Sequence, residues 1–201
     1  MPELGKSIKA TVVFTIIAGS AIGIILAGIL GNSKMLINES FENNVLDWQI
    51  GKDLPIDPNT HLPVYASVQT TNIRSRTGEF SLLLQIDGRQ DDGTIWIAKN
   101  ITLGGAKFGK IEMAFYVFSE QASFNVKANV VAYVGPCPPL NESYFEVLGN
   151  ADRKTGWTEF IVEKNIFFKN TDYAWIALGI TVAWETILEY TIDDITVRLL
   201  W

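Results

Sequence analysis

Two adjacent aspartates, Asp193 and Asp194, lie in the middle of the largely apolar sequence YTIDDITVRL at residues 190–199. Paired carboxylates can act as acid and base in glycoside hydrolysis, provided that they lie the right distance apart. The chain has 22 acidic residues, so pairs are common in it, and no local motif marks one pair as catalytic. Ser81 and Ser143 lack the turn that exposes a catalytic serine, and no glycine-rich phosphate loop leads from a strand into a helix. We therefore expect no enzyme and no catalytic residues.

Other reactive side chains are few. A single cysteine, Cys137, cannot form an intrachain disulfide and excludes cysteine-based metal clusters. A single histidine, His61, excludes histidine-rich metal sites. The net charge is −6 and no run of lysine or arginine occurs, whereas nucleic-acid binding needs a concentrated basic surface. The composition therefore excludes nucleic acid as a partner.

The N-terminal part of the chain predicts a membrane anchor. Residues 10–30, ATVVFTIIAGSAIGIILAGIL, contain no charged side chain. As a helix this stretch would be about 31 Å long, which matches a hydrocarbon core of about 30 Å. Lys6 and Lys9 precede it, so the positive-inside rule places the N-terminus in the cytoplasm. The expected parts are a short cytoplasmic N-terminus (1–9), a transmembrane helix or uncleaved signal anchor in contact with lipid (10–31), and an extracytoplasmic domain (35–201).

Two other interpretations of this segment stay open. A cleaved signal peptide usually has a shorter apolar region of about 7–15 residues, and a pilin-like leader would be cut near Ala10 and leave the helix for assembly. Gly19, Gly23 and Ala27 lie four residues apart on one helix face, a pattern that permits close packing against a partner helix. Residues 32–34 form only a short tether, so we expect the outer domain to lie close to the bilayer.

Beyond Met35, apolar and polar residues alternate, which is typical of half-buried strands. The pattern is clearest at 79–86, at 110–118 and at 122–134, where Phe124 and Val126 are expected to face the core. Further strands are expected at 35–41, 64–72, 94–103, 144–148, 157–168, 173–183 and 188–200. Turn residues separate these runs, and no soluble helix is evident. The sequence predicts an all-β fold, an antiparallel β-sandwich or jelly roll, preceded by the single transmembrane helix.

Five segments together resemble the galactose-binding-like jelly rolls found in many carbohydrate-binding modules. The opening strand of those modules is similar to LINESFENNVLDWQ at 36–49, and their closing strand, with its Asp-Asp pair, is similar to YTIDDITVRL. Between these two, GEFSLLLQI, TIWIAKNITL and GWTEFIVEKNI resemble internal strands of the family, in the same order. The resemblance covers residues 36–199, and it implies a jelly roll with a structural or binding role.

The resemblance implies one structural calcium ion where the first and last strands lie close together. Calcium is held by hard oxygen ligands, mostly carboxylates and backbone carbonyls. Glu42 matches the acid of the opening strand, and Asp194 or Asp193 matches the closing pair. The backbone of Gly78 and Glu79 would supply carbonyl oxygens. Alternatively, both aspartates are solvated, or one of them caps a turn.

Strand alternation conflicts with this arrangement unless the last strand is irregular. If Ile192 faces the core, Asp193 should point outward. A bulge at the acid pair would let one aspartate turn toward the ion while Ile195 and Val197 return to the core.

The resemblance also implies glycan binding, in which sugar rings stack on exposed tryptophan or tyrosine rings. Trp96 and Trp157 match positions that are usually in the core of the family. Tyr173 and Trp175 share the face of their strand that points away from the core-facing residues. Three interpretations of this pair stay open: a platform for a ligand, a contact with another subunit, or a partly covered surface. The four candidate ligand-binding residues are Trp48, Tyr133, Tyr173 and Trp175, and Tyr65 and Trp184 are further candidates for a binding face.

Three Asn-X-Ser/Thr sequons, at Asn38, Asn100 and Asn141, fit an outer domain that is glycosylated. Two functions follow from the sequence. The first is a non-catalytic structural or accessory subunit of an envelope or membrane assembly, anchored by its helix and in contact with other subunits. The second is a carbohydrate-binding module displayed on the cell surface. We expect the first, because fold alone does not establish sugar binding.

Overall fold

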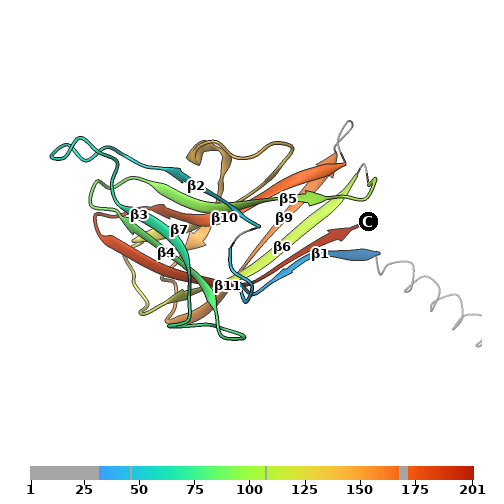
Figure 1. The fold of residues 1–201 in the computed structure, drawn as a ribbon, viewed down its shortest axis with the longest axis horizontal. Helices are drawn as coiled ribbons and strands as arrows, with labels where there is room; N and C mark the ends of the chain where they lie inside the picture. Colours follow the sequence, from blue (N-terminus) through green and yellow to red (C-terminus); the bar gives the residue numbers. More distant parts are fainter. Residues whose placement is uncertain (1–31, 46, 107, 168–171) are drawn as a thin grey trace, which may run out of the picture. The chain divides into compact units, whose positions relative to one another are not determined.

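The computed structural model describes residues 32–45, 47–106, 108–167 and 172–201 (Figure 1). The chain divides into two units, one with the residues up to Ser33 together with Trp201, and the other Lys34–Leu200. The strands that the structure describes are β1 (Ser33–Glu39), β2 (Gln49–Asp53), β3 (Ala66–Thr71), β4 (Ser81–Asp87), β5 (Thr94–Thr102), β6 (Phe108–Ser119), β7 (Ala128–Gly135), β8 (Glu146–Asn150), β9 (Gly156–Phe167), β10 (Tyr173–Val182) and β11 (Ile187–Leu200). One turn of 3-10 helix, η1 (Glu142–Tyr144), lies between β7 and β8.

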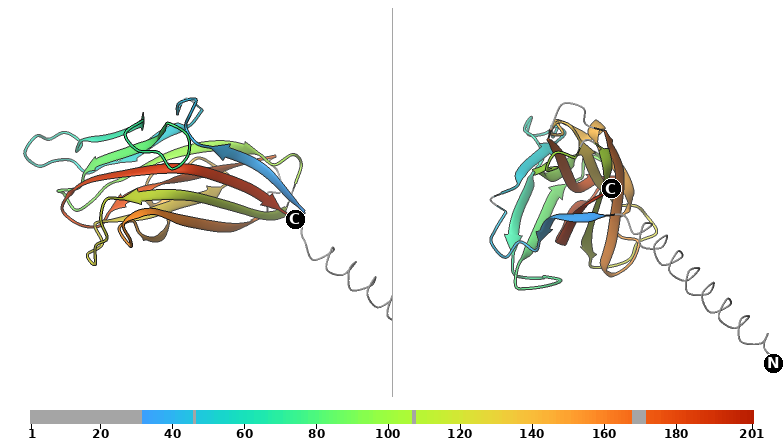
Figure 2. Two further views of the ribbon diagram at one scale, coloured as in Figure 1. Left: turned by 90° about the horizontal axis from the view of Figure 1, so that it is seen from below. Right: turned by 90° about the vertical axis from the view of Figure 1, so that its right-hand side faces the viewer.

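The strands form two antiparallel sheets that face each other (Figure 2). The six-stranded sheet has the order β3-β4-β11-β6-β9, and β1 pairs with β11 as well. The five-stranded sheet has the order β2-β5-β10-β7-β8. The predicted all-β antiparallel sandwich is therefore confirmed.

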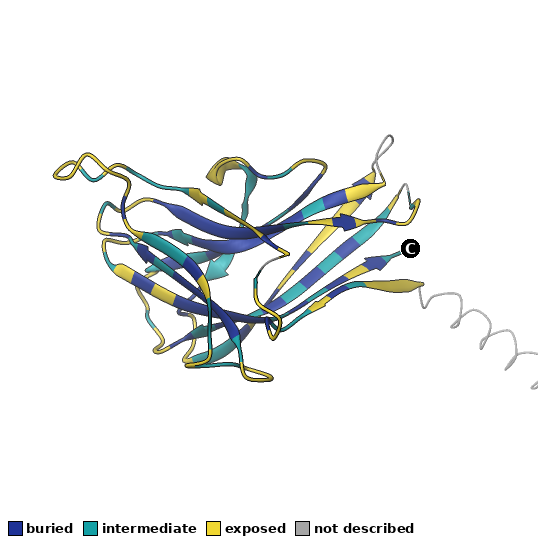
Figure 3. Cartoon of the chain, viewed as in Figure 1, coloured by how far each residue is buried: buried dark blue, intermediate teal, exposed yellow. Residues whose placement is uncertain are grey.

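The core lies between the sheets and is made by the alternating residues that the sequence pattern predicts. Along β6, Ile111, Met113, Phe115 and Val117 are fully buried and alternate with half-buried residues (Figure 3). β9 pairs with β6 over its whole length and adds Phe160 and other apolar residues to the same layer. Burial of each large apolar side chain stabilises the fold by about 1.5–3 kcal/mol, so the core can hold the two sheets together without a disulfide.

The prediction of one strand over 122–134 was wrong in its first half. β7 begins at Ala128, where its pairing with β10 also ends, and Phe124 and Val126 are exposed instead of facing the core. Upstream of Ala128 the chain makes a local bond, in which the Ser123 hydroxyl donates to the Asn125 carbonyl at 2.8 Å. Such local bonds compete with a sheet ladder, and β10 ends opposite Ala128, so among the described strands β10 offers no partner further upstream.

β2 was not predicted, because its sequence QIGKD lacks alternation. Among the described strands it pairs with β5 alone, at the edge of its sheet, so it has little need of a regular apolar face. The expected helix at 10–31, with Gly19, Gly23 and Ala27, lies outside the described residues. Within the described ranges, no helix is long and apolar enough to cross a membrane.

The buried carboxylate of Asp152, in the turn after β8, binds two neighbouring strands of the six-stranded sheet, β6 and β11. Asp152 accepts hydrogen bonds from the Ser119 hydroxyl of β6 at 2.6 Å and from the Tyr190 hydroxyl of β11 at 2.8 Å. All three residues are buried. Burial and the bond to Asp152 raise the pKa of Tyr190 far above its usual value, so its hydroxyl remains a donor.

Replacement of Asp152 by alanine should lower the free energy of unfolding by about 2–4 kcal/mol, because the buried Tyr190 hydroxyl loses its acceptor and the Ser119 hydroxyl keeps only the Gln121 carbonyl. Urea denaturation of the full chain measures this change. The matched control is Asp47→Ala, whose side chain is 83% exposed, and it should change the free energy by less than about 0.5 kcal/mol. Equal stability of the two variants would contradict the role assigned to Asp152.

Candidate functional site

The acid pair of β11 lies at an irregularity of the strand. The register of β11 against β6 shifts between Asp193 and Thr196, and Asp194 has a left-handed backbone with φ of 49°. A bulge of this kind adds a residue to one strand, so Ile192 and Ile195 can both face the core although they lie three residues apart. The irregularity that the acid pair required is thus present. Asp193 pairs with Tyr116 on the outer side of the sheet, as alternation predicts, and its side chain is fully buried because residues 76 and 77 cover it.

Asp193 binds the loop between β3 and β4, residues 72–80. Its Oδ2 accepts the backbone N–H groups of Arg76 at 2.7 Å and Thr77 at 3.2 Å, and its Oδ1 accepts the N–H of Asp194 at 2.8 Å. Burial raises the pKa of Asp193 above its usual value, and these N–H donors oppose the rise because they favour the carboxylate.

Asp194 and Glu42 hold the same loop from other directions. Asp194 forms an ion pair with the Arg76 guanidinium and accepts the Thr77 hydroxyl. The guanidinium carbon of Arg76 lies 3.6 Å from the centre of the Tyr116 ring, a cation–π contact. Glu42 accepts the backbone N–H groups of Glu79 at 3.1 Å and Phe80 at 2.9 Å. The three acids therefore serve to fasten loop 72–80 to the sheet.

The donor set fits calcium in kind, because carboxylates and loop carbonyls are the ligands that calcium prefers. In the structure, however, Glu42, Asp193 and Asp194 accept hydrogen bonds from loop 72–80. No group of three or more histidine, cysteine, aspartate or glutamate side chains placed to hold a metal occurs among the described residues. A calcium ion would compete with Arg76 for Asp194, and its binding stays a prediction.

The outer face of the five-stranded sheet carries a second apolar cluster. Trp96 of β5 is buried on this face, although its side chain points away from the main core. Its indole lies over Gly51 of β2, where a Cβ atom would meet the ring at 2.1 Å, so only glycine fits there. Phe145 packs against the indole with a centroid distance of 5.0 Å. Trp96 is thus buried as expected, but by a covering segment rather than by the opposite sheet.

Residues 136–145, between β7 and β8, form this covering segment. Its 3-10 turn is fixed across the sheet, since the N–H of Glu142 donates to Asp53 at 3.0 Å and the Thr94 hydroxyl donates to the Glu142 carboxylate at 3.2 Å. Tyr133 lies beneath the segment and donates its hydroxyl to the carbonyl of Cys137 at 2.9 Å. Burial, together with this neighbour, raises the pKa of Tyr133 to about 12. The covering segment closes one half of the face.

The other half of this face is open and carries the expected aromatic pair. Tyr173 is 49% exposed and Trp175 is half-buried, and alternation puts both on the outer side of β10. Trp175 pairs with Asn100 of β5, and Tyr173 pairs with Thr102, so these polar side chains lie beside the rings. Gln49 of β2, which pairs with Ala98, is exposed on the same side. We call the five residues Gln49, Asn100, Thr102, Tyr173 and Trp175 the open face.

Two other tryptophans are placed differently from their expectations. Trp48, a candidate for ligand binding, is buried in the main core, donates its indole N–H to Glu39 at 3.3 Å, and offers no open ring. Trp157 was expected in the core, but it is only half-buried and packs edge-on against Phe118 at 5.3 Å between centroids. The structure therefore brings together Tyr133, Tyr173 and Trp175 of the four candidates, with Tyr133 under the covering segment.

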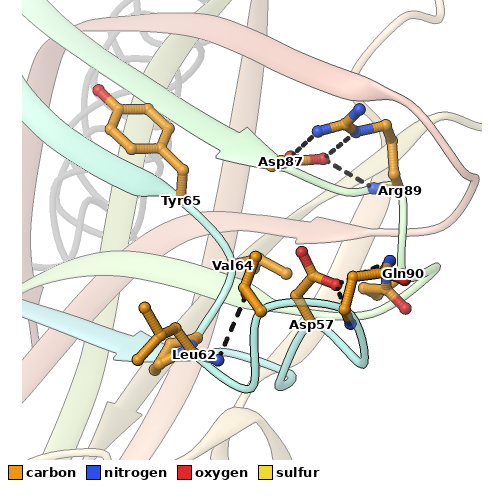
Figure 4. A pocket seen from close by; sticks show the side chains of 10 residues that line it. Asp57, Leu62, Val64, Tyr65, Asp87, Arg89 and Gln90 are labelled. Atoms are coloured by element: carbon orange, nitrogen blue, oxygen red, sulfur yellow. Dashed lines mark hydrogen bonds and ion pairs between the residues drawn. The ribbon is translucent and has the colours of Figure 1, made fainter.

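A separate pocket of about 500 Å³ lies at the turns that contain Asp57 and Arg89 (Figure 4). Its polar groups are engaged locally. Asp87 binds the Arg89 guanidinium, which lowers the pKa of the carboxyl group, and Asp57 accepts the N–H of Asn59 at 2.8 Å. Tyr65 contributes an exposed ring. For stacking on a ligand, the pocket thus offers one aromatic ring, that of Tyr65, whereas the open face offers two, those of Tyr173 and Trp175.

All three sequon asparagines are exposed. Asn38 lies on β1, and Asn141 caps η1 by accepting the Ser143 N–H at 3.1 Å. Asn100 belongs to the open face, so a glycan attached there would occupy the space beside Trp175. Glycosylation itself stays a prediction.

The chain matches no family model and no curated protein, but it is similar to solved structures. One of them explains the promiscuous specificity of carbohydrate-binding modules from the β-sandwich superfamily. It has a TM-score of 0.52 at 17% identity. That match covers 82% of this chain and 61% of the other, which is less than two thirds of it. The K3 adhesin domain of Lys-gingipain from Porphyromonas gingivalis has a TM-score of 0.51 at 12% identity, with coverage of 83% and 99%.

A third similar structure contains modules of endo-1,4-β-D-xylanase 10B from Clostridium thermocellum, complexed with xylohexaose. Its TM-score is 0.50 at 16% identity, with coverage of 82% of this chain and 28% of the other. This chain therefore shares the two-sheet β-sandwich fold of these structures. Identities this low establish the fold alone.

The contact between Glu42 and loop 72–80 can be tested through two glycines with positive φ. Gly78→Ala would bring a Cβ within 2.3 Å of the Glu42 carboxylate, whereas a Cβ at Gly105 meets nothing within 4 Å. Gly105→Ala should cost about 1 kcal/mol from backbone strain, and Gly78→Ala about 1–2 kcal/mol more, because Glu42 must leave its N–H donors. Chemical denaturation measures both changes.

A double-mutant cycle isolates this contact. In a Glu42→Ala background, the excess cost of Gly78→Ala over Gly105→Ala should disappear. An excess that persists without the carboxylate would show that Glu42 does not hold the loop.

Proposed function

We propose that the chain binds a neutral glycan on the open face and does so without catalysis. The observation that carries this proposal is the aromatic pair Tyr173 and Trp175 on the outer side of β10, beside the polar side chains of Asn100 and Gln49. Ring faces stack on the apolar faces of sugars, and amides form hydrogen bonds with hydroxyl groups. This combination of groups suits a sugar better than a purely apolar ligand.

Charge favours a neutral ligand. None of the five residues of the open face is charged, so the face offers no cation to a sulfate or carboxylate group. The whole chain carries a net charge of −6, which disfavours acidic polymers. The xylohexaose complex of a similar structure is consistent with a neutral oligosaccharide, although the likeness itself is one of fold.

We further propose that residues 10–30 anchor the chain in a membrane with its N-terminus in the cytoplasm and the sandwich outside. The uncharged stretch and the preceding Lys6 and Lys9 support this topology, as do the three exposed sequons. The alternative role, an accessory subunit of an envelope assembly, would be favoured if another protein chain covered the open face. Glycan binding and coverage by protein exclude each other at this surface.

Calcium binding by Glu42, Asp193 and Asp194 is a separate proposal about stability. The ion would supply positive charge to carboxylates that now rely on Arg76 and on backbone N–H groups. It would strengthen the hold on loop 72–80 and take no part in glycan recognition.

Trp175→Ala should weaken binding of a neutral oligosaccharide by about tenfold or more, which corresponds to about 1.4 kcal/mol or more. The ligand is first identified on a glycan array with the full-length protein in a detergent that has no sugar headgroup. Isothermal titration calorimetry then measures the affinity of each variant. Tyr173→Ala should weaken binding as well.

Two exposed aromatic residues elsewhere serve as matched controls. Trp184→Ala and Tyr65→Ala should leave the affinity unchanged, because Trp184 lies in the turn before β11 and Tyr65 lines the separate pocket. Loss of binding in Tyr65→Ala, with normal binding in Trp175→Ala, would show that the glycan binds in that pocket and not on the open face. An array on which no neutral glycan binds would refute the proposal.

Millimolar calcium should raise the melting temperature above that measured in chelator, by about 5–11 °C if the ion is present at about 100 times its dissociation constant. Asp194→Asn should abolish the shift, and Asp91→Asn, at an exposed turn residue, should preserve it. Differential scanning calorimetry provides the measurement. Identical melting curves in calcium and in chelator would exclude the ion.

A further inference from the structure

One end of the sandwich exposes a pair of phenylalanines. Phe108 is the first residue of β6 and Phe167 is the last residue of β9, and they lie directly opposite each other in the antiparallel pair. Each is 70% exposed. Residues opposite each other in a ladder have Cβ atoms about 4.5–5.5 Å apart on one side of the sheet. The two rings therefore form a single apolar surface.

β1 begins at this same end. Leu200, the last residue of β11, pairs with Lys110 near the start of β6, and β1 starts beside the end of β11 (Figures 1 and 2). Near the start of β1, Met35 is exposed. The adjacent Lys34 is also exposed, and its ammonium group lies beside Gly104 in the turn between β5 and β6. We call Lys34, Met35, Phe108 and Phe167 the phenylalanine end.

The chain itself indicates what lies against the phenylalanine end. The apolar stretch ends at Leu30 and the sandwich begins at Lys34. Four residues of extended chain span at most about 14 Å, so an anchor at residues 10–30 would keep this end near the point where the chain leaves the hydrocarbon. Aromatic rings and nearby lysines are typical of the interface between lipid headgroups and acyl chains.

We propose that the phenylalanine end rests on the bilayer surface and inserts Phe108 and Phe167 into the headgroup region. This inference depends on the proposed anchor at residues 10–30, and it adds the orientation of the sandwich. β11 would then extend away from the membrane, with Leu200 at the end that lies nearer the bilayer. Ile187, an exposed apolar residue at the other end of β11, would be about 43 Å away along the strand and in water.

Spin labels measure the depth of each position. The full chain with Cys137→Ser is prepared with a single nitroxide at Phe108→Cys, Phe167→Cys or Ile187→Cys, and is placed in nanodiscs of phosphatidylcholine and phosphatidylglycerol. Cys137 is exposed, so its replacement disturbs little. Electron paramagnetic resonance then compares the access of oxygen, which concentrates in lipid, with that of a water-soluble nickel complex.

The labels at 108 and 167 should show an oxygen-to-nickel access ratio several-fold higher than the label at 187. Equal ratios at the three positions would overturn the proposal, and so would labels at 108 and 167 that are shielded from both reagents, since another protein would then cover them. Co-elution of the chain with nanodiscs on gel filtration is read separately. A chain that elutes without lipid would refute the anchor itself, whereas co-elution with equal ratios would refute only the orientation.

Discussion

A sheet has two faces, and a two-layer sandwich can bury only one face of each. The outer face of each sheet must therefore be covered by the chain's own residues, exposed as a polar surface, or used for binding. The five-stranded sheet divides its outer face, because residues 136–145 cover Trp96 while Tyr173 and Trp175 stay open. This division concentrates the possible binding surface on one half of one sheet. The covering segment is therefore as important for the site as the rings themselves, since it leaves a ligand no access to Trp96.

The acid pair of β11 shows how a buried charge is accommodated in a strand. An isolated carboxylate without partners would be very costly to bury, so Asp193 is buried with three backbone N–H donors. Asp193 lies on the outer side of the six-stranded sheet beneath loop 72–80, and the bulge after it gives Asp194 a position from which it binds Arg76. Stacking of Arg76 on Tyr116 holds the same loop against this outer face. One irregularity thus links the last strand, loop 72–80 and the sheet surface.

The sandwich could be predicted from sequence because its central strands bury one face each, so that burial and sequence period agree, as in β6. Edge strand β2 and the turn containing Phe124 could not be predicted in this way. In neither of them does the apolar pattern of the sequence agree with burial. The open face was only half predicted. Strand parity identified Tyr173 and Trp175, but Gln49 and Asn100 join them through the register between strands, which depends on long-range pairing. Nothing local in 136–145 indicates that it folds back over the sheet.

The two proposed surfaces are structurally independent, although they lie near the same end of the sandwich. Tyr173 pairs with Thr102, close to the turn that leads to Phe108, so the open face begins near the phenylalanine end. Phe108 and Phe167, however, have the parity of the outer side of the six-stranded sheet, and the whole core separates them from the open face. Contact of one surface with lipid would therefore leave the other free to bind. A glycan on the open face would be held close to the bilayer, within reach of other molecules on the same membrane.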